Sequence, residues 1–252
     1  MQILFTLCGR AGSKGIKGKN VRDFVGKPLA LYSLSAIDLY IRRHPEHAYQ
    51  IALNTDSREL QKIITNSGLA ENMSVNIVER RDTLAGDFVG KVAVLLDTLE
   101  QMENCTGVRS DMLVDLDITS PLRTVADLEH LIDKKASLDC DVVYSVTESR
   151  RNPYFNMVKK ADRGYEKVLP SDFVSRQQAP AIYDLNASLY AYAPEFLRSG
   201  KNVLDGRGEI VEMLDTGVLD LDKPSDFELM EVIGAWLFEK NPEFREIRDN
   251  IS

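Results

Sequence analysis

Short apolar runs alternate with longer segments of helical periodicity along almost the whole chain. The apolar runs at 3–7, 50–53, 75–78, 112–117, 142–146, 187–192 and 209–213 are predicted to be strands. Helices are predicted at 29–42, 58–67, 88–102, 125–135 and 224–238. Because this alternation is typical of βαβ units, it predicts an α/β protein with a mainly parallel sheet flanked by helices.

The pattern breaks in two places. Residues 148–183 carry Pro153, Pro170 and Pro180, several aromatic side chains and little periodicity. Such a segment is too long for an ordinary loop, so we predict an arm inserted within a single domain that spans 1–252. The charged tail at 239–252 is predicted to be a solvated helix end.

Composition and charge narrow the class of protein. The 252 residues are 44% hydrophobic and 28% charged, as expected for a globular chain. No apolar run approaches the roughly 18 residues of a membrane span. Three cysteines without paired spacing favour a reducing cytoplasm over a disulfide framework or a zinc site. The net charge of −8 argues against binding to nucleic acid or an anionic membrane.

The loop after the first predicted strand concentrates glycines and cations. It reads Cys-Gly-Arg-Ala-Gly-Ser-Lys-Gly-Ile-Lys-Gly-Lys-Asn and holds Arg10, Lys14, Lys17 and Lys19. Glycine lets backbone N–H groups approach an anion, and the cations offset the charge of a triphosphate. The spacing matches neither the Walker pattern nor the dinucleotide fingerprint. We therefore predict a phosphate loop of another kind, with a flexible, solvated basic turn as the alternative.

Two further clusters have chemical uses and also simpler explanations. Asp117, with Thr119, Ser120 and Arg123 after a buried strand, could orient a carboxylate or a polyol. The same stretch could also be a helix cap followed by proline. Asp220 and Asp222 alternate along a predicted strand, so both could reach a hard cation such as Mg²⁺. Asp222 could instead cap the helix that begins with Pro224.

Other polar residues remain undecided from spacing alone. Arg176, Gln177 and Gln178, with Asn186, could hydrogen-bond a carboxylated sugar or form a polar surface arm. Arg80 and Arg81 could contact a nucleotide or simply be exposed. Because the sequence shows no Ser-His-Asp or Cys-His arrangement, we expect a direct displacement between two bound ligands.

Five motifs follow one another along the chain. They are Arg10-x-Gly12-Ser13-Lys14-Gly15 with Lys19-Asn20, Thr55-Asp56, Thr119-Ser120-Pro121-Leu122-Arg123, Arg176-Gln177-Gln178 and Asp220-x-Asp222. In this respect the chain resembles the CMP-sialic acid synthetases, or acylneuraminate cytidylyltransferases, from Leu4 to about Leu229. The resemblance implies a Rossmann-like nucleotidyltransferase fold and a homodimer in which an arm crosses to the partner. It also implies transfer of CMP from CTP to the anomeric hydroxyl of a nine-carbon α-keto acid, with release of pyrophosphate.

The resemblance also assigns roles to individual residues. It implies a CTP site made of Arg10, Gly12, Ser13, Lys14, Lys19, Asn20 and Arg80. It implies catalytic roles for Arg10, Lys19 and Asp222, and Mg²⁺ ligands at Asp220 and Asp222. It implies sugar contacts from Asp117, Thr119, Ser120, Arg123, Arg176, Gln177, Gln178, Asn186 and Tyr190.

One departure from the family pattern concerns the sugar. Bacterial sialic acid enzymes usually have glutamine where this chain has Asp117, and a carboxylate only accepts hydrogen bonds. The sequences Asp-Leu-Asp and Asn-Pro-Tyr-Phe-Asn look more like the legionaminic acid branch, with the deaminated sialic acid KDN as another acceptor. The alternatives are a cytidylyltransferase for the eight-carbon acid KDO, a sugar-1-phosphate nucleotidyltransferase, and a non-catalytic nucleotide-binding protein on this fold.

Overall fold

The sheet at the centre of the protein is mostly parallel. The computed structural model describes residues 1–12, 15–86, 89–216, 221 and 223–251. In this part of the chain the main sheet consists of β1 (Gln2–Cys8), β4 (Ala48–Thr55), β5 (Val75–Glu79), β6 (Met112–Leu116), β7 (Val142–Glu148), β10 (Tyr183–Tyr192) and β11 (Gly208–Glu212). Their order is β11-β7-β10-β6-β1-β4-β5, and within this sheet only β10 runs antiparallel to its neighbours. The predicted α/β class with a mainly parallel sheet is confirmed.

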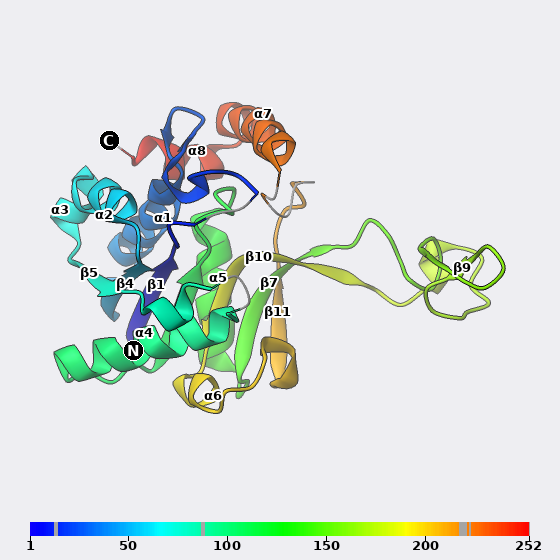
Figure 1. Ribbon diagram of the computed structural model, residues 1–252, viewed down its shortest axis with the longest axis horizontal. Coiled ribbons are helices and arrows are strands. Elements are labelled where there is room, and N and C mark those ends of the chain that lie inside the picture. Colours follow the sequence, from blue (N-terminus) through cyan, green and yellow to red (C-terminus); the bar gives the residue numbers. More distant parts are fainter. Residues whose placement is uncertain (13–14, 87–88, 217–220, 222, 252) are drawn as a thin grey trace.

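Helices cover both faces of this sheet (Figure 1). They are α1 (Leu29–Arg43), α2 (Arg58–Thr65), α3 (Gly68–Asn72), α4 (Lys91–Thr106), α5 (Val125–Ser137), α6 (Pro194–Arg198), α7 (Pro224–Lys240) and α8 (Pro242–Asp249). Successive side chains of a strand point to opposite faces. Thus Ile3, Phe5 and Leu7 belong to the core with α1, α2, α5, α7 and α8, whereas Leu4 belongs to the core with α4 and α6.

Local capping chemistry sets several helix boundaries that periodicity alone placed differently. The helix predicted at 58–67 is α2, which Ser57 caps and which ends at Thr65. Ser67 then caps α3, a short helix at Gly68–Asn72 that the pattern did not predict. The helix predicted to begin at 88 begins at Lys91. It continues to Thr106, where Gly107 takes a left-handed conformation with φ of 71°.

The segment between β7 and β10 projects far from the rest of the molecule (Figure 1). Its base is an antiparallel ribbon in which Glu148 pairs with Tyr183. Its tip holds a small hairpin of β8 (Val158–Lys160) and β9 (Tyr165–Lys167), which the sequence pattern did not predict. The irregular stretch at 148–183 therefore includes an extended arm.

The prediction of a solvated tail is wrong. Residues 242–249 form α8, and Phe244, Ile247 and Ile251 are buried in the core. The hydroxyl of Ser35 in α1 donates a hydrogen bond to the carbonyl of Ile247 over 2.7 Å. The apolar side chains recur every three or four residues, which is helical spacing, but the many charges between them hide this pattern.

No helix within the described part of the chain combines the length and apolar character that a membrane span requires. Short 3₁₀ turns lie at Lys19–Val21, Asp82–Leu84, Arg176–Gln178 and Val203–Asp205. Two two-residue strands, β2 (Asp23–Phe24) and β3 (Lys27–Pro28), pair with each other.

The parallel strands β1, β4, β5 and β6 end at one edge of the sheet, and in such folds ligands bind at this edge.

Candidate active site

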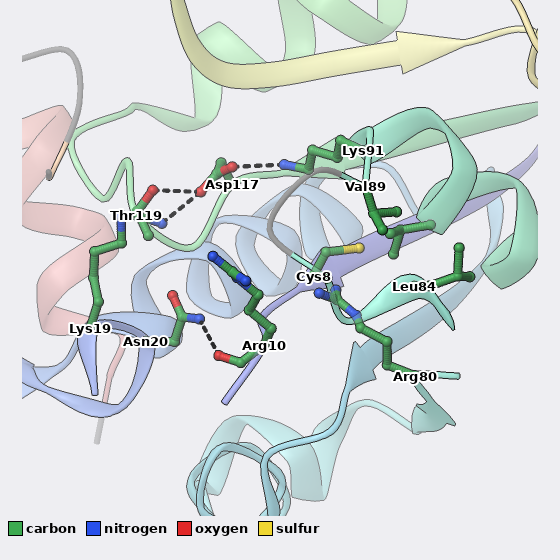
Figure 2. A pocket seen from close by; sticks show the side chains of 12 residues that line it. Cys8, Arg10, Lys19, Asn20, Arg80, Leu84, Val89, Lys91, Asp117 and Thr119 are labelled. Atoms are coloured by element: carbon green, nitrogen blue, oxygen red, sulfur yellow. Dashed lines mark hydrogen bonds and ion pairs between the residues drawn. The ribbon is translucent and has the colours of Figure 1, made fainter. Parts of the chain in front are cut away.

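A cavity of about 280 Å³ opens at the carboxyl ends of β1, β5 and β6 (Figure 2). Cys8, at the end of β1, and Arg80, just after β5, form part of its wall. Asp117 and Thr119 follow β6, and Lys91 is the first residue of α4. The remaining lining residues are Arg10, Lys19, Asn20, Leu84, Gly86, Val89 and Val94. The cavity is therefore cationic, with an apolar wall at one end.

The backbone of the predicted phosphate loop is fixed at both ends. A Cβ atom on Gly9 would lie 2.6 Å from Cδ2 of Leu60, so a larger residue here would require that buried side chain to shift. Gly18 has a φ of 64°, which glycine adopts without strain. The amide of Asn20 donates to the carbonyl of Arg10 over 3.1 Å, and so closes the loop. Gly12 lies on the exposed side of the loop, while Ser13 and Lys14 lie outside the described residues.

Three of the predicted nucleotide contacts line this cavity as cations. Lys19 donates from Nζ to the carbonyl of Leu221 over 2.8 Å. Arg10 extends into the cavity, and its Nη1 lies 3.5 Å from the carbonyl of Ala85 (Figure 2). Arg80 is buried, and its Nε donates to Oδ1 of Asn54 over 2.7 Å. The structure thus brings together Arg10, Lys19, Asn20 and Arg80 from segments far apart in sequence.

Lys91 is a cavity residue that the sequence analysis missed. Its Nζ lies 2.7 Å from Oδ2 of Asp115 and 2.7 Å from Oδ2 of Asp117. Burial would lower the pKa of Lys91, but the two carboxylates hold it well above its usual value. Burial would likewise raise the pKa of Asp117, but Lys91 and hydrogen bonds from Thr119 lower it to about 2. Both groups are therefore charged at neutral pH.

Cys8 also lines the cavity, yet its thiol is unsuited to nucleophilic attack. Burial, reinforced by the nearby carboxylate of Asp115, raises the pKa of this thiol. Only the thiolate is a strong nucleophile, so Cys8 is inert at neutral pH. The expected direct displacement, in which the protein supplies no covalent intermediate, stays a prediction.

The structure places Arg123 inside the protein, with its guanidinium directed at the loop that follows β6. This side chain is buried and donates to the hydroxyl of Ser33 over 2.8 Å and to the carbonyl of Asp117 over 2.6 Å. It also donates to the carbonyl of Ser120 and to the hydroxyl of Ser188. These bonds hold the loop that carries Asp117 and Thr119, whereas the sequence suggested a sugar contact for Arg123.

Replacing Arg123 with methionine should lower the free energy of unfolding by about 2–4 kcal/mol, because buried carbonyl and hydroxyl groups lose their donor. Urea unfolding of the wild type and the variant measures this difference. The control is Arg109→Met, since Arg109 is exposed and its pair with Glu103 should contribute less than about 1 kcal/mol. Equal small losses in the two variants would contradict the holding role of Arg123.

Two other predicted sugar contacts, Asn186 and Tyr190, do not line this cavity. Asn186 is buried, and its side chain contacts Ser145, the backbone of Ser188 and Met213. With Ser120 it lines a separate, much smaller hollow. Tyr190 stacks on Tyr192, with ring centroids 5.9 Å apart.

The predicted carboxylate contacts on the arm are also separate from the cavity. Arg176 and Gln177 line a hollow of about 360 Å³ at the base of the arm, together with Glu148 and Asn152. There Arg176 donates to Oε1 of Glu148 over 2.9 Å. The side-chain oxygen of Gln178 accepts from the backbone N–H of Val174, which stabilises the local turn. Within the described residues, the predicted sugar contacts are thus divided among the nucleotide cavity, the small hollow beside Asn186 and the hollow at the base of the arm.

The predicted metal ligands, Asp220 and Asp222, lie outside the described residues. Leu221 stands between them in sequence, and its carbonyl accepts the hydrogen bond from Lys19. Leu221 itself belongs to neither a helix nor a strand. Among the residues that the structure does describe, no group of three or more His, Cys, Asp or Glu side chains could hold a metal ion.

Comparison with known proteins shows which fold and which family the chain shares. No family model matches the sequence. The solved structure of a CMP:2-keto-3-deoxy-manno-octonic acid synthetase in complex with CTP superposes with a TM-score of 0.64. It covers 94% of this chain and 99% of its own, and its 14% identity shows the fold alone. A 4-diphosphocytidyl-2C-methyl-D-erythritol synthase from Anaerococcus prevotii gives 0.55 at 13% identity, covering 92% of this chain and 97% of its own. The protein therefore has a nucleotidyltransferase fold.

Sequence relatives identify the family. Post-translational flagellin modification protein B of Campylobacter coli is 32% identical over 95% of this chain and 97% of its own. The CMP-N,N'-diacetyllegionaminic acid synthase of Campylobacter jejuni is 30% identical over 92% and 94%. An N-acylneuraminate cytidylyltransferase of Streptococcus agalactiae is 26% identical over 95% of this chain but only 54% of its own. The chain belongs to the cytidylyltransferase family that contains the N-acylneuraminate and legionaminic acid enzymes.

Proposed function

We propose that this enzyme transfers CMP from CTP to the anomeric hydroxyl of a nine-carbon α-keto acid and releases pyrophosphate. The observation that carries the proposal is the cationic cavity beside the phosphate loop, in a chain related to such enzymes along nearly its whole length. A diacetylated legionaminic acid is the preferred acceptor in this proposal. The 30% identity to a legionaminic acid enzyme over 92% of the chain supports that choice.

The cavity residues divide between the two ends of the nucleotide. Leu84 and Val89 form an apolar wall beside Arg80, which suits a base. Arg10 and Lys19 face the other end, where they would neutralise charge on the phosphates, and Asn20 lies beside them (Figure 2). Charge builds up on the α-phosphate and on the departing pyrophosphate as the acceptor hydroxyl attacks. Fixed cations in a site shielded from water lower the energy of that transition state.

A magnesium ion is part of the proposed reaction. Asp220 and Asp222 would hold it, because hard divalent cations favour carboxylate oxygens. The contact between Lys19 and the carbonyl of Leu221, which lies between the two aspartates in sequence, supports a place for this ion near the phosphates. When bound, magnesium supplies positive charge to the triphosphate oxygens.

The active form in this proposal is a homodimer, with the arm of each chain completing the partner's site. The arm leaves apolar side chains in solvent, among them Tyr165 at 74% and Val174 at 79% exposure. Val232 and Trp236 on α7 are also exposed, at 69% and 59%. Exposed apolar surface of this kind is typical of an interface. Arg176 lines a hollow at the base of the arm and not the nucleotide cavity of its own chain, which supports the same arrangement.

The test is pyrophosphate release from CTP, with and without magnesium, on a panel of acceptors. The panel holds diacetyllegionaminate, N-acetylneuraminate, KDN, pseudaminate and KDO. We expect the highest kcat/KM with diacetyllegionaminate, and no release when magnesium is chelated. Preferential turnover of KDO would assign the chain to the eight-carbon acids. Tight CTP binding without release on any acceptor would instead favour a non-catalytic nucleotide-binding protein.

A further inference from the structure

Lys91 and Asp115 have no assigned role in the proposed reaction, although they form an ion-paired cluster with Asp117, for which the resemblance implies a sugar contact. Lys91 lies between Asp115 and Asp117, 2.7 Å from an oxygen of each. Asp115 is completely buried, and its other oxygen accepts a hydrogen bond from the hydroxyl of Thr6 over 2.9 Å. Lys91 and Asp117 both line the cavity, with side chains that are 33% and 23% exposed. Buried Asp115 thus anchors the cluster on its inner side, while Lys91 and Asp117 stay accessible from the cavity.

The hydrogen-bonding capacity of the pair leaves one donor and one acceptor for a ligand. An ammonium group has three N–H donors, and two of those on Lys91 face the two aspartates. Oδ1 of Asp117 accepts from both the backbone N–H and the hydroxyl of Thr119, each over 2.8 Å. Oδ2 contacts Lys91 and has a second lone pair left. The free donor and the free acceptor therefore lie next to each other at the cavity surface.

We propose that Lys91 and Asp117 together bind one sugar hydroxyl of a substrate, which accepts from Lys91 and donates to Asp117. A hydroxyl is the simplest group that both donates and accepts through a single atom. It could belong to the acceptor acid or to the ribose of CTP. This inference rests on the proposed function and makes Lys91 a specificity-determining residue.

Two physical arguments favour a hydroxyl over other ligands. The Lys91 ammonium occupies the space between the two carboxylates, so the pair cannot also hold a metal ion. The cluster has two carboxylates and one ammonium, and this negative balance disfavours a phosphate or a carboxylate as the ligand. A neutral hydroxyl accepts a hydrogen bond from the free donor and donates one to the free acceptor without adding charge. Hydrogen bonds to charged groups contribute about 1.5–3 kcal/mol, which is enough to discriminate between related sugars.

The experiment removes hydroxyls from each substrate and the matching groups from the enzyme. We would measure kcat/KM with 2'-deoxy-CTP, with 3'-deoxy-CTP, and with analogues of the best acceptor that each lack one hydroxyl other than the anomeric one. One analogue should cost the wild type about 10- to 100-fold. The same analogue should cost Lys91→Met less than about threefold, because the hydroxyl no longer has its partner.

Two further variants separate the loss of a hydroxyl contact from a loss of folding or of surface charge. Lys91→Met leaves buried Asp115 without its cation and could unfold, so Asp117→Asn is measured as well. In that variant Thr119 retains the side-chain oxygen, the amide turns toward Lys91, and the acceptor for the hydroxyl is lost. The control is Lys134→Met, since Lys134 has similar exposure and pairs with Glu209 outside this cavity. It should discriminate among the analogues as the wild type does.

The outcomes separate this inference from the proposed function. Absence of pyrophosphate release by the wild type on every acceptor contradicts the proposed function. In that case the calorimetric affinities of wild type and variants for CTP and its deoxy analogues still show whether Lys91 binds a ribose hydroxyl. If each deoxy analogue costs the wild type and both variants the same factor, Lys91 and Asp117 bind no hydroxyl and the inference is wrong. The identity of the discriminating analogue shows whether the hydroxyl comes from the acceptor or from CTP.

Discussion

Replacing Lys19 with methionine lowers kcat for pyrophosphate release by about 10²- to 10³-fold, as removal of one fixed group that stabilises transition-state charge typically does. Methionine keeps the length of the side chain and removes its charge. Lys19 lines the cavity and donates to the carbonyl of Leu221, so its ammonium is held in place before the nucleotide binds. The effect should fall mainly on kcat, because the charge that Lys19 stabilises grows as pyrophosphate departs.

Lys17→Met is the matched control for this prediction. Lys17 belongs to the same loop, but it is exposed and does not line the cavity. Its substitution removes the same net charge and should change kcat by less than about twofold, because exposed charges are screened by solvent. Thermal unfolding of both variants checks that the loop stays intact. Equal losses in the two variants, or a loss at Lys19 confined to the KM for CTP, would contradict a role in the transition state.

The sequence was sufficient for the architecture because the central strands β1, β4 and β6 are largely buried on both faces. β1 reads as a continuous apolar run, and residues 3–7 are all buried in the structure. Boundaries were less predictable, because they depend on single capping side chains. α2 ends at Thr65, two residues before the predicted end, and Ser67 caps α3, which the pattern did not predict. The C-terminal helix was misread for a different reason: Phe244 and Ile247 are few among many charges, and only packing against α1 shows that they are core residues.

The candidate site was predictable where one segment carries several functional side chains. The loop around Arg10 and Lys19 is such a segment, and both residues line the cavity. Lys91 was missed because it is a lone lysine at the start of a helix, and its aspartate partners are 24 and 26 residues away in sequence. Lys91 could have been identified from the sequence as a cation that directly follows a glycine and begins a helix. Arg123 shows the opposite limit, since its spacing fits a ligand contact while the fold directs it at backbone carbonyls.

Mixing two inactive variants should restore activity if each arm completes its partner's site. Lys19→Met disables the cavity, and Arg176→Ala removes the guanidinium that the resemblance assigns to the sugar. In a mixed dimer, one site then combines an intact cavity with an intact arm from the partner. Random pairing makes half of the dimers mixed, so about a quarter of all sites regain function in a symmetric homodimer. Pyrophosphate release should therefore rise from near zero to about one quarter of the wild-type rate.

The same experiment gives the opposite result if each chain uses its own arm. Every cavity with Lys19→Met stays inactive, and every intact cavity then faces its own Arg176→Ala arm, so mixing restores nothing. The control mixes Lys19→Met with Arg10→Ala, two cavity variants that cannot complement each other in either arrangement. Subunits are exchanged by mild denaturation and dilution, and sizing chromatography follows assembly. Recovery in the first mixture but not in the control requires that Arg176 act across the dimer, because in one chain it lies in a hollow separate from the nucleotide cavity.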